Sequence, residues 1–239
     1  MNIAVIFAGG VGKRMRSKDL PKQFLVIHGK PIIVRTVELF EKHSDIEAIV
    51  VACVPEWIEY CEQLFSQYGF NKVAKVVAGG TTGQESIYKG LQAAEVVSGG
   101  ERSVVLVHDG VRPLISESTI TDNIDAVRTY GSAVTCVPAK ETVVEIDEGG
   151  EVVKVPERSH IRFARAPQSY WLDELIAAHG RAIADGREFV DSASMMRAYG
   201  HSLHLVDGPE ENIKITTPGD FFAMRAILDA RENEQIYVS

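Results

Sequence analysis

The segment Asn2–Gln23, NIAVIFAGGVGKRMRSKDLPKQ, decides the fold, because an apolar run passes directly into glycines and then into basic residues. The apolar residues 3–7 predict a buried strand. The glycines let the backbone approach a ligand and offer N–H groups to oxygen anions. The basic side chains, opposed only by Asp19, are Lys13, Arg14, Arg16, Lys18 and Lys22. The segment therefore predicts a nucleoside triphosphate site at the C-terminal end of the first strand.

Further apolar runs follow at the spacing of β-α-β units, over residues 48–53, 73–77, 104–107 and 133–137. Helical patterns lie between them, over residues 31–42, 55–68, 118–130 and a stretch that carries Ile87, Leu91 and Ala94. Because each strand is apolar enough to be buried on both faces, we expect a Rossmann-like α/β fold, a mostly parallel sheet with helices on both faces. Ligands bind such sheets at the carboxyl ends of the strands. The polar segments 8–23, 79–86 and 108–113 all fall there.

The pattern changes after the fifth strand. Short β runs at 141–145 and 151–155 flank Asp147-Glu148-Gly149-Gly150, which predicts a hairpin turn. An inserted β-hairpin arm over residues 139–165 has little core of its own, so we expect it to serve dimerisation. We expect the chain to form a single domain over residues 1–239.

The remaining segments predict a strand at 162–166, helices at 172–184 and 191–199, and a strand at 202–206. Residues 212–216 are expected to be extended. A last helix should begin with Thr217 as N-cap and Pro218 in the first position.

The composition of the chain argues against a nucleic-acid-binding protein and against a membrane protein. The 239 residues carry a net charge of −8, so no broad basic face is expected and nucleic acid is not a predicted partner. The three cysteines, Cys53, Cys61 and Cys136, lack metal-ligand spacing and indicate free thiols in a reducing compartment. The apolar run at residues 2–8 is too short to span a membrane. A cytoplasmic protein with no membrane partner is expected.

Two common glycine motifs are excluded at residues 7–15. A P-loop would need Gly at Phe7 and Ser or Thr at Arg14. A dinucleotide fingerprint that starts at Gly10 would need Gly at Met15. The open alternative is a glycine-rich turn followed by a solvated basic helix. Against it stands Lys22, placed directly before an apolar pair.

Three other segments carry candidate ligand groups, each with a plainer alternative. Asp109 at a strand end suits a ribose hydroxyl or Mg²⁺, or it pairs with Arg112 and caps a turn, and His108 is expected to be structural. Residues 79–86 could cradle a base, or form an ordinary loop and helix cap. Lys214 lies between isoleucines, where strand alternation would put it on the polar side next to Thr216.

Taken together, these segments closely resemble one family, the cytidylyltransferases that couple CTP to a sugar-alcohol phosphate. The matching motifs are AGGVGKRM at 8–15, PKQF at 21–24, HDGVRP at 108–113, KET at 140–142, APQSY at 166–170 and NIKITTP at 212–218. They occur in order over essentially the whole chain. The family includes the enzymes for 2-C-methyl-D-erythritol 4-phosphate and for D-ribitol 5-phosphate.

The resemblance implies a nucleotidyltransferase, a homodimer formed through the arm, and Mg²⁺ as the divalent cation. The acceptor phosphate would attack the α-phosphorus of CTP in line, and pyrophosphate would leave. By position in the motifs, the catalytic residues would be Arg14, Lys22 and Lys214. CTP would be bound by Ala8, Gly9, Gly10, Gly80, Thr81, Ser86, Asp109 and Gly110, with Asp109 also the candidate metal ligand. The acceptor would be bound by Arg112, Thr142, Arg158, Asp191 and Thr216.

Some positions depart from the family pattern. Ala166 and Val190 stand where relatives often carry Thr, and Thr81 and Gly83 replace an acidic residue and an Arg. The stretches GKPIIVRTVELF, PEWIEYCEQ and DNIDAV favour ribitol 5-phosphate as acceptor, with CDP-ribitol for a wall or capsule polymer. The alternative is the methylerythritol enzyme of isoprenoid biosynthesis.

Rival classes are a non-catalytic nucleotide-binding protein, a glycosyltransferase and an NAD-dependent oxidoreductase. The sequence lacks the Asp-x-Asp pair that the glycosyltransferase would need. The failed dinucleotide fingerprint disfavours the oxidoreductase.

Overall fold

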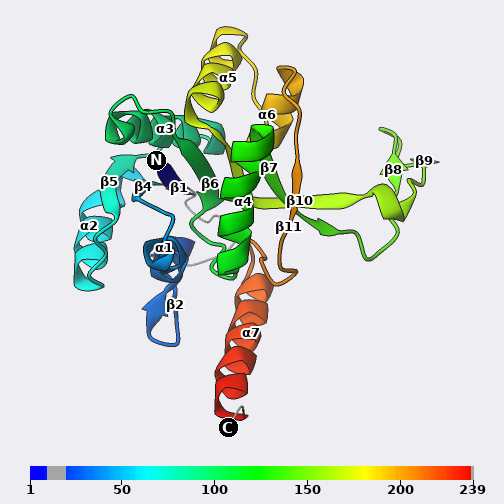
Figure 1. Ribbon diagram of the computed structural model, residues 1–239. Helices are drawn as coiled ribbons and strands as arrows, with labels where there is room; N and C mark the ends of the chain where they lie inside the picture. The colour runs from blue at the N-terminus through cyan, green and yellow to red at the C-terminus, as the bar shows by residue number, and fades with distance from the viewer. Residues whose placement is uncertain (10–19, 238–239) are drawn as a thin grey trace.

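The computed structural model describes residues 1–9 and 20–237, and its centre is a seven-stranded sheet (Figure 1). The strands are β1 (Asn2–Ala8), β4 (Ala48–Cys53), β5 (Val73–Ala78), β6 (Val104–Asp109), β7 (Ser132–Pro138), β10 (Arg162–Trp171) and β11 (Leu205–Asp207). Their order is β11-β7-β10-β6-β1-β4-β5. Every pairing is parallel except those of β10 with β6 and β7. The predicted mostly parallel α/β sheet is confirmed.

Helices cover both faces because the central strands alternate their apolar side chains between two cores. Ala4 and Ile6 of β1 face one core, with α1 (Ile32–Lys42), α2 (Ile58–Gln67) and α4 (Glu117–Tyr130). Ile3 and Val5 face the other, with α3 (Gly83–Ser98), α5 (Leu172–Ala184) and α6 (Ser192–Ala198). In the part of the chain that the structure describes, no helix is both long and apolar enough to cross a membrane.

Strand β10 is longer than predicted, and it is antiparallel to its neighbours β6 and β7. The sequence pattern stopped at residue 166, because Gln168 and Ser169 interrupt the apolar run. Both are nevertheless buried, since their side chains find partners: Ser169 donates to Asn123 Oδ1 at 2.8 Å, and the backbone N–H of Ala193 donates to Gln168 Oε1 at 2.8 Å. Hydrogen-bonded burial of polar groups cannot be recognised from apolar periodicity.

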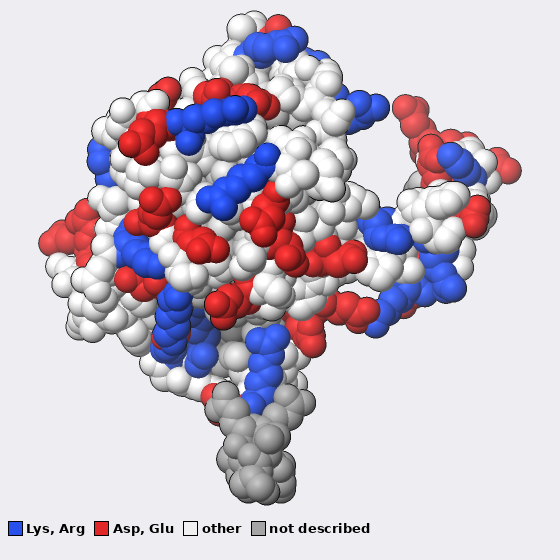
Figure 2. All heavy atoms as spheres, in the orientation of Figure 1, with Lys and Arg blue, Asp and Glu red and all other residues white. Residues whose placement is uncertain are grey.

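The predicted arm is present as a short hairpin that projects from the body, as the ribbon (Figure 1) and the space-filling view (Figure 2) both show. Strands β8 (Glu145–Ile146) and β9 (Val152–Lys154) pair antiparallel and are shorter than the predicted runs. The turn forms where it was predicted, because Asp147 Oδ1 accepts hydrogen bonds of 2.9 Å from the backbone N–H groups of Gly149 and Glu151. Short one-turn helices η2 (Lys22–Phe24), η3 (Pro55–Trp57) and η4 (Arg158–His160) and the pair β2 (Val26–Ile27) and β3 (Lys30–Pro31) complete the connections.

The extended strand expected at 212–216 is wrong, since this segment has no regular structure and lies outside the sheet. Asn212 is buried and donates to the carbonyl of Ala166 at 2.6 Å, and Ile215 N–H donates to the carbonyl of Val111 at 3.1 Å. The segment is therefore tied to strand β10 and to the turn that follows β6. Helix α7 (Pro218–Tyr237) begins as predicted, and Thr217 Oγ1 accepts from Asp220 N–H at 3.3 Å.

Candidate active site

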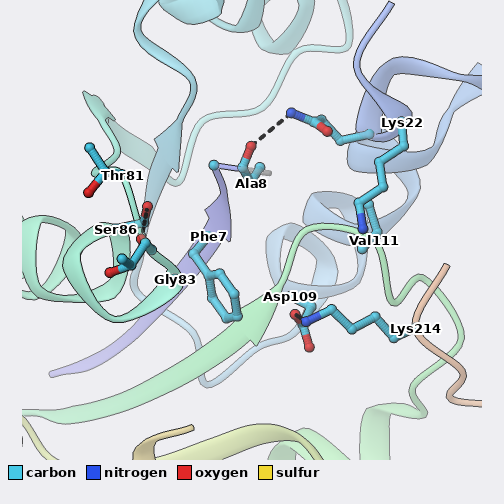
Figure 3. Close-up of a pocket in the computed structure, with 12 residues that line it drawn as sticks. Phe7, Ala8, Lys22, Thr81, Gly83, Ser86, Asp109, Val111 and Lys214 are labelled. Atoms are coloured by element: carbon cyan, nitrogen blue, oxygen red, sulfur yellow. Dashed lines mark hydrogen bonds and ion pairs between the residues drawn. The ribbon is translucent and has the colours of Figure 1, made fainter. Parts of the chain in front are cut away.

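The carboxyl ends of β1 and β6 bring the glycine segment to Asp109. These strands are neighbours, and Phe7 is in register with Asp109. A cavity of about 240 Å³ opens there, which we call the β1 cavity (Figure 3). Its lining residues are Phe7, Ala8, Gly9, Lys22, Gln23, Thr81, Thr82, Gly83, Ser86, Asp109, Val111 and Lys214. The structure thus unites segments that the sequence predicted to share one rim.

Ser86 fixes the wall of the β1 cavity where β1 and β5 end. Its hydroxyl accepts from Gly80 N–H at 2.9 Å and donates to the carbonyl of Thr82 at 2.8 Å. A Cβ on Gly9 would lie 2.7 Å from Ser86 Oγ, so any other residue at position 9 would require Ser86 or the backbone to shift. Gly80, a predicted CTP-binding residue, thus uses its N–H for a hydrogen bond inside the protein.

The loop before α3 is ordered by Glu85. Its carboxylate accepts from Thr81 N–H at 2.7 Å and from Thr81 Oγ1 at 2.9 Å. These two hydrogen bonds, together with Lys89, lower the pKa of Glu85 to about 2. Thr82 caps the helix by accepting from Glu85 N–H at 3.1 Å. The helix cap is present, and the same loop also lines the β1 cavity.

Asp109 is buried and holds a cation on each carboxylate oxygen. Lys214 Nζ lies 2.5 Å from Oδ1, and Arg112 Nε lies 2.7 Å from Oδ2. Burial alone would raise the pKa of Asp109, but these two charges hold it below its usual value. The predicted turn pair with Arg112 is present, and Lys214 joins it. Lys214 also lies 5.6 Å from the ring centroid of Phe7.

His108 is structural, as predicted. It is fully buried, and its Nε2 lies 2.9 Å from the carbonyl oxygen of Arg112. Burial lowers the pKa of His108 to about 4, so the ring is neutral at pH 7.

A second cavity of about 240 Å³, the β10 cavity, lies beyond the Asp109–Lys214 pair. It is lined by Phe7, Val107, Asp109, Arg112, Ala164, Arg165, Ala166, Gln168, Val190, Asp191 and Lys214. Phe7, Asp109 and Lys214 line both cavities. Two ligands bound side by side would therefore meet across these three side chains.

Asp191 enters the β10 cavity as the cap of α6. Its Oδ1 accepts from Ser194 N–H at 2.8 Å, and its Oδ2 accepts from Gln168 Nε2 at 2.9 Å. The predicted binding residue is therefore also a helix cap. Ala166 and Val190, the positions that depart from the family pattern, both line this cavity.

Lys22 reaches the β1 cavity from η2. Its Nζ donates to the carbonyl of Ile215 at 3.0 Å, which ties the first rim segment to the 212–216 segment. The next residue, Gln23, is buried and donates to the carbonyl of Ala8 at 2.8 Å (Figure 3). Lys22 is thus held against the backbone of the residue that follows Lys214, and both lysines line the β1 cavity.

Several predicted residues are not in the lining of either cavity. Gly110 N–H donates to the carbonyl of Phe7 at 3.0 Å, and Thr216 N–H and Oγ1 each donate to Asp220 at 2.8 Å. Thr142 and Arg158 are exposed on the arm, where Arg158 NH1 donates to the carbonyl of Lys140 at 3.0 Å. The predicted roles of Gly10 and Arg14 lie outside the described residues.

Sequence reasoning missed other lining residues: Phe7, Gln23, Val111, Arg165 and Gln168. Phe7 and Gln23 stood at the edges of motifs that were recognised, so their positions carried a signal. Arg165 carried none, since a single Arg near the end of a predicted strand suggests an exposed side chain.

The whole chain is similar to known proteins of one family. The IspD family model, described as 2-C-methyl-D-erythritol 4-phosphate cytidylyltransferase, matches residues 2–230. The ribitol-5-phosphate cytidylyltransferase of Streptococcus agalactiae serotype V is 51% identical over 99% of this chain and 99% of its own length. The 2-C-methyl-D-erythritol 4-phosphate cytidylyltransferase of Alkaliphilus metalliredigens is 37% identical over 96% and 93%.

A solved structure supports the same relationship. The 4-diphosphocytidyl-2C-methyl-D-erythritol synthase of Anaerococcus prevotii superposes with a TM-score of 0.84 at 25% identity. The match covers 95% of this chain and 96% of that one. The similarity therefore extends over nearly the whole length of both chains.

Proposed function

The chain belongs to the IspD family of cytidylyltransferases, and we propose that it transfers the cytidylyl group of CTP to ribitol 5-phosphate. A phosphate oxygen of the acceptor forms a bond to the α-phosphorus of CTP, the bond to the β-phosphate oxygen breaks, and CDP-ribitol and pyrophosphate result. The observation that carries this proposal is the Asp109–Lys214 pair, which forms the wall common to two cavities.

The β1 cavity suits CTP. Ala8 and Gly9 offer backbone groups, and Thr81 and Ser86 border the side on which the base would lie. Lys22 and Lys214 supply positive charge for the triphosphate, and Arg14 is assigned the same role from its motif. Removing a preorganised cation at a crowded, negatively charged transition state is expected to lower kcat more than it raises KM.

Mg²⁺ fits this proposal as part of the MgCTP substrate. Among the residues that the structure describes, no group of three or more His, Cys, Asp and Glu side chains could hold a metal ion. Both oxygens of Asp109 are held by cations, so this carboxylate does not fit a resident metal. Proteins often bind Mg²⁺ largely through the phosphates of a substrate and water. Activity is expected to be lost in EDTA and to return when Mg²⁺ exceeds CTP.

The acceptor is assigned from the relatives, since identity to the ribitol 5-phosphate enzyme is 51% against 37% for the methylerythritol enzyme. The test is pyrophosphate release from MgCTP with ribitol 5-phosphate, 2-C-methyl-D-erythritol 4-phosphate or glycerol 3-phosphate, each over a range of concentrations. The highest kcat/KM with ribitol 5-phosphate supports the proposal. A preference for methylerythritol phosphate would replace it with the alternative acceptor. CTP binding without turnover on any of the three would favour a nucleotide-binding protein.

We further propose that each chain forms a single domain and that the arm joins two chains into a homodimer. Its exposed apolar residues, Val144, Ile146, Val152, Val153 and Val155, lack the cover that such side chains normally have. The double variant Ile146→Asp/Val153→Asp should sediment as a monomer where the wild type sediments as a dimer. A monomeric wild type at micromolar concentration would refute the proposal.

In a dimer, Thr142 and Arg158 would bind the acceptor in the partner's β10 cavity. This role is tested by mixing two inactive variants, Arg158→Ala and Lys214→Ala, and allowing subunits to exchange. If Arg158 acts across the interface, the mixed dimer holds one intact site and activity exceeds that of either parent. If Arg158 acts within its own chain, each site of the mixed dimer keeps one lesion and no activity returns.

A further inference from the structure

Arg165 is aimed over the rim by an irregularity in β10. The strand pairs with β7 at Ala164 opposite Cys136 and again at Gln168 opposite Val134, so the residues between leave the regular ladder. Such bulges bend a strand and redirect its side chains, often next to active sites. Here Ala164, Arg165 and Ala166 line the β10 cavity, and Arg165 is half-buried.

Two guanidinium groups converge on one backbone oxygen at this point. Arg165 NH1 donates to the carbonyl of Asn212 at 2.7 Å, and Arg112 NH1 donates to the same oxygen at 2.8 Å. Asn212 is itself buried and fixed by its bond to Ala166. The pair of arginines is therefore preorganised by the backbone, without a ligand.

The charge around these arginines is not balanced. Arg112 shares the single charge of Asp109 with Lys214, and Asp191 is held by α6 and Gln168. No salt bridge to Arg165 is present among the described residues. Burial and the positive charge of Arg112 lower the pKa of Arg165, whereas Glu210, which is itself paired with Lys140, acts in the opposite direction. An anion placed between them would remove this repulsion.

We propose that Arg165, together with Arg112, binds the phosphate monoester of the acceptor in the β10 cavity. This inference rests on the proposed function and adds a residue to its acceptor site. Two guanidinium forks suit the oxygens of a dianionic phosphate, which a polyol hydroxyl would not require. Lys214 lines the same cavity and also the β1 cavity, so a phosphate held there lies beside the bound nucleotide.

The experiment compares wild type with Arg165→Gln, which keeps a polar side chain of similar length, and with Arg165→Lys, which keeps the charge but loses the fork. Arg165→Gln should lower kcat/KM for the acceptor about 10- to 100-fold, as expected for the loss of charge-assisted hydrogen bonds, while KM for CTP stays within about twofold. Arg165→Lys should fall between the two. Arg128→Gln removes an exposed charge from the outer surface of α4 and should behave as wild type.

Inorganic phosphate is the probe that separates this inference from the choice of acceptor. It should inhibit wild type competitively with the acceptor, and its inhibition constant should rise in Arg165→Gln in parallel with the loss of acceptor kcat/KM. An unchanged phosphate inhibition constant would overturn the inference, as would an acceptor KM within about twofold of wild type. If ribitol 5-phosphate itself is not a substrate, the function fails but phosphate binding, followed by ³¹P NMR in wild type and Arg165→Gln, still decides the role of Arg165.

Discussion

The two cavities that share the Asp109–Lys214 wall are lined by different kinds of chemical group. The β1 cavity is lined largely by backbone and small side chains, such as Ala8, Gly9 and Gly83. The β10 cavity has an apolar part as well, but its polar groups are side chains, among them Arg112, Arg165 and Gln168. A backbone-lined site suits a ligand that every family member shares, whereas side chains can change from one member to the next. We therefore expect changes in the β1 cavity to affect CTP and changes in the β10 cavity to affect the acceptor.

The largest effect should come from Lys214, because it lines both cavities. Lys214→Ala leaves Asp109 with Arg112 alone and removes a cation from the position between the two ligands. We expect kcat to fall about 10²- to 10³-fold, as when one preorganised charge-stabilising group is removed from an active site. Steady-state kinetics with each substrate varied in turn would measure this. Lys75→Ala removes an exposed Lys from β5 and is the control; a Lys214→Ala enzyme as active as that control would contradict the shared-wall model.

A narrower effect is expected at Gly9, which should impair CTP binding and spare the acceptor. In Gly9→Ala the new Cβ would lie 2.7 Å from Ser86 Oγ, so the wall of the β1 cavity must shift. Displacement of a positioning element by a fraction of an ångström is expected to raise KM for CTP about 10-fold or more. Steady-state kinetics, with CTP and then the acceptor as the varied substrate, would measure both KM values. Gly180→Ala in α5, where a Cβ meets no atom within 4 Å, is the matched control. An equal rise in acceptor KM would break the division between the cavities.

The same difference in lining explains how much of each cavity could be predicted from the sequence. The β1 cavity was largely predictable, because its groups lie in short contiguous motifs at strand ends and the parallel sheet brings those ends together. The arginine pair of the β10 cavity was not, because it depends on a register shift in β10 and on the buried Asn212, neither of which has a periodic signature. The prediction of a strand at 212–216 was wrong for the same reason, because the hydrogen bonds that hold this irregular segment have no periodic signature in the sequence. Its hydrogen bonds go to the irregular part of β10 and to the turn after β6, and they do not form a β ladder.

A third prediction concerns the support behind the β1 cavity, where α3 packs against α5. His179 of α5 is buried, stacks on Tyr88 of α3 at 5.4 Å between ring centroids, and has no hydrogen-bond partner for either ring nitrogen among the described residues. Burial lowers its pKa to about 4. In the unfolded chain this His has a pKa of about 6.5. As the pH falls from about 6.5 to 4, the unfolded state therefore binds a proton that the folded state does not bind, and the free energy of unfolding decreases.

His179→Phe removes this proton difference while it keeps an aromatic ring against Tyr88. We expect the difference in unfolding free energy between the variant and the wild type to be about 2 kcal/mol more favourable to the variant at pH 5 than at pH 7. This figure follows from roughly 1.4 kcal/mol for each pH unit below the unfolded pKa. Urea unfolding at both pH values would measure it. His160→Phe on the arm, where His160 is exposed, is the control. A gain independent of pH would assign the effect to packing alone.

The smallest effect should be the most informative about the boundary between the cavities. Gln84 lies in the first turn of α3, yet its Nε2 donates to the carbonyl of Arg187 at 3.2 Å and its Oε1 accepts from Phe189 N–H at 2.8 Å. It therefore ties the loop of the β1 cavity to the segment that leads into Val190 and Asp191 of the β10 cavity. Gln84→Ala should raise the acceptor KM about three- to tenfold through loss of these two hydrogen bonds, although Gln84 lines neither cavity. Gln63→Ala, an exposed Gln on α2, is the control for a nonspecific effect. If the Gln84 variant changes only KM for CTP, the two cavities are mechanically independent; if it changes only acceptor KM, the donor loop helps to position the acceptor site.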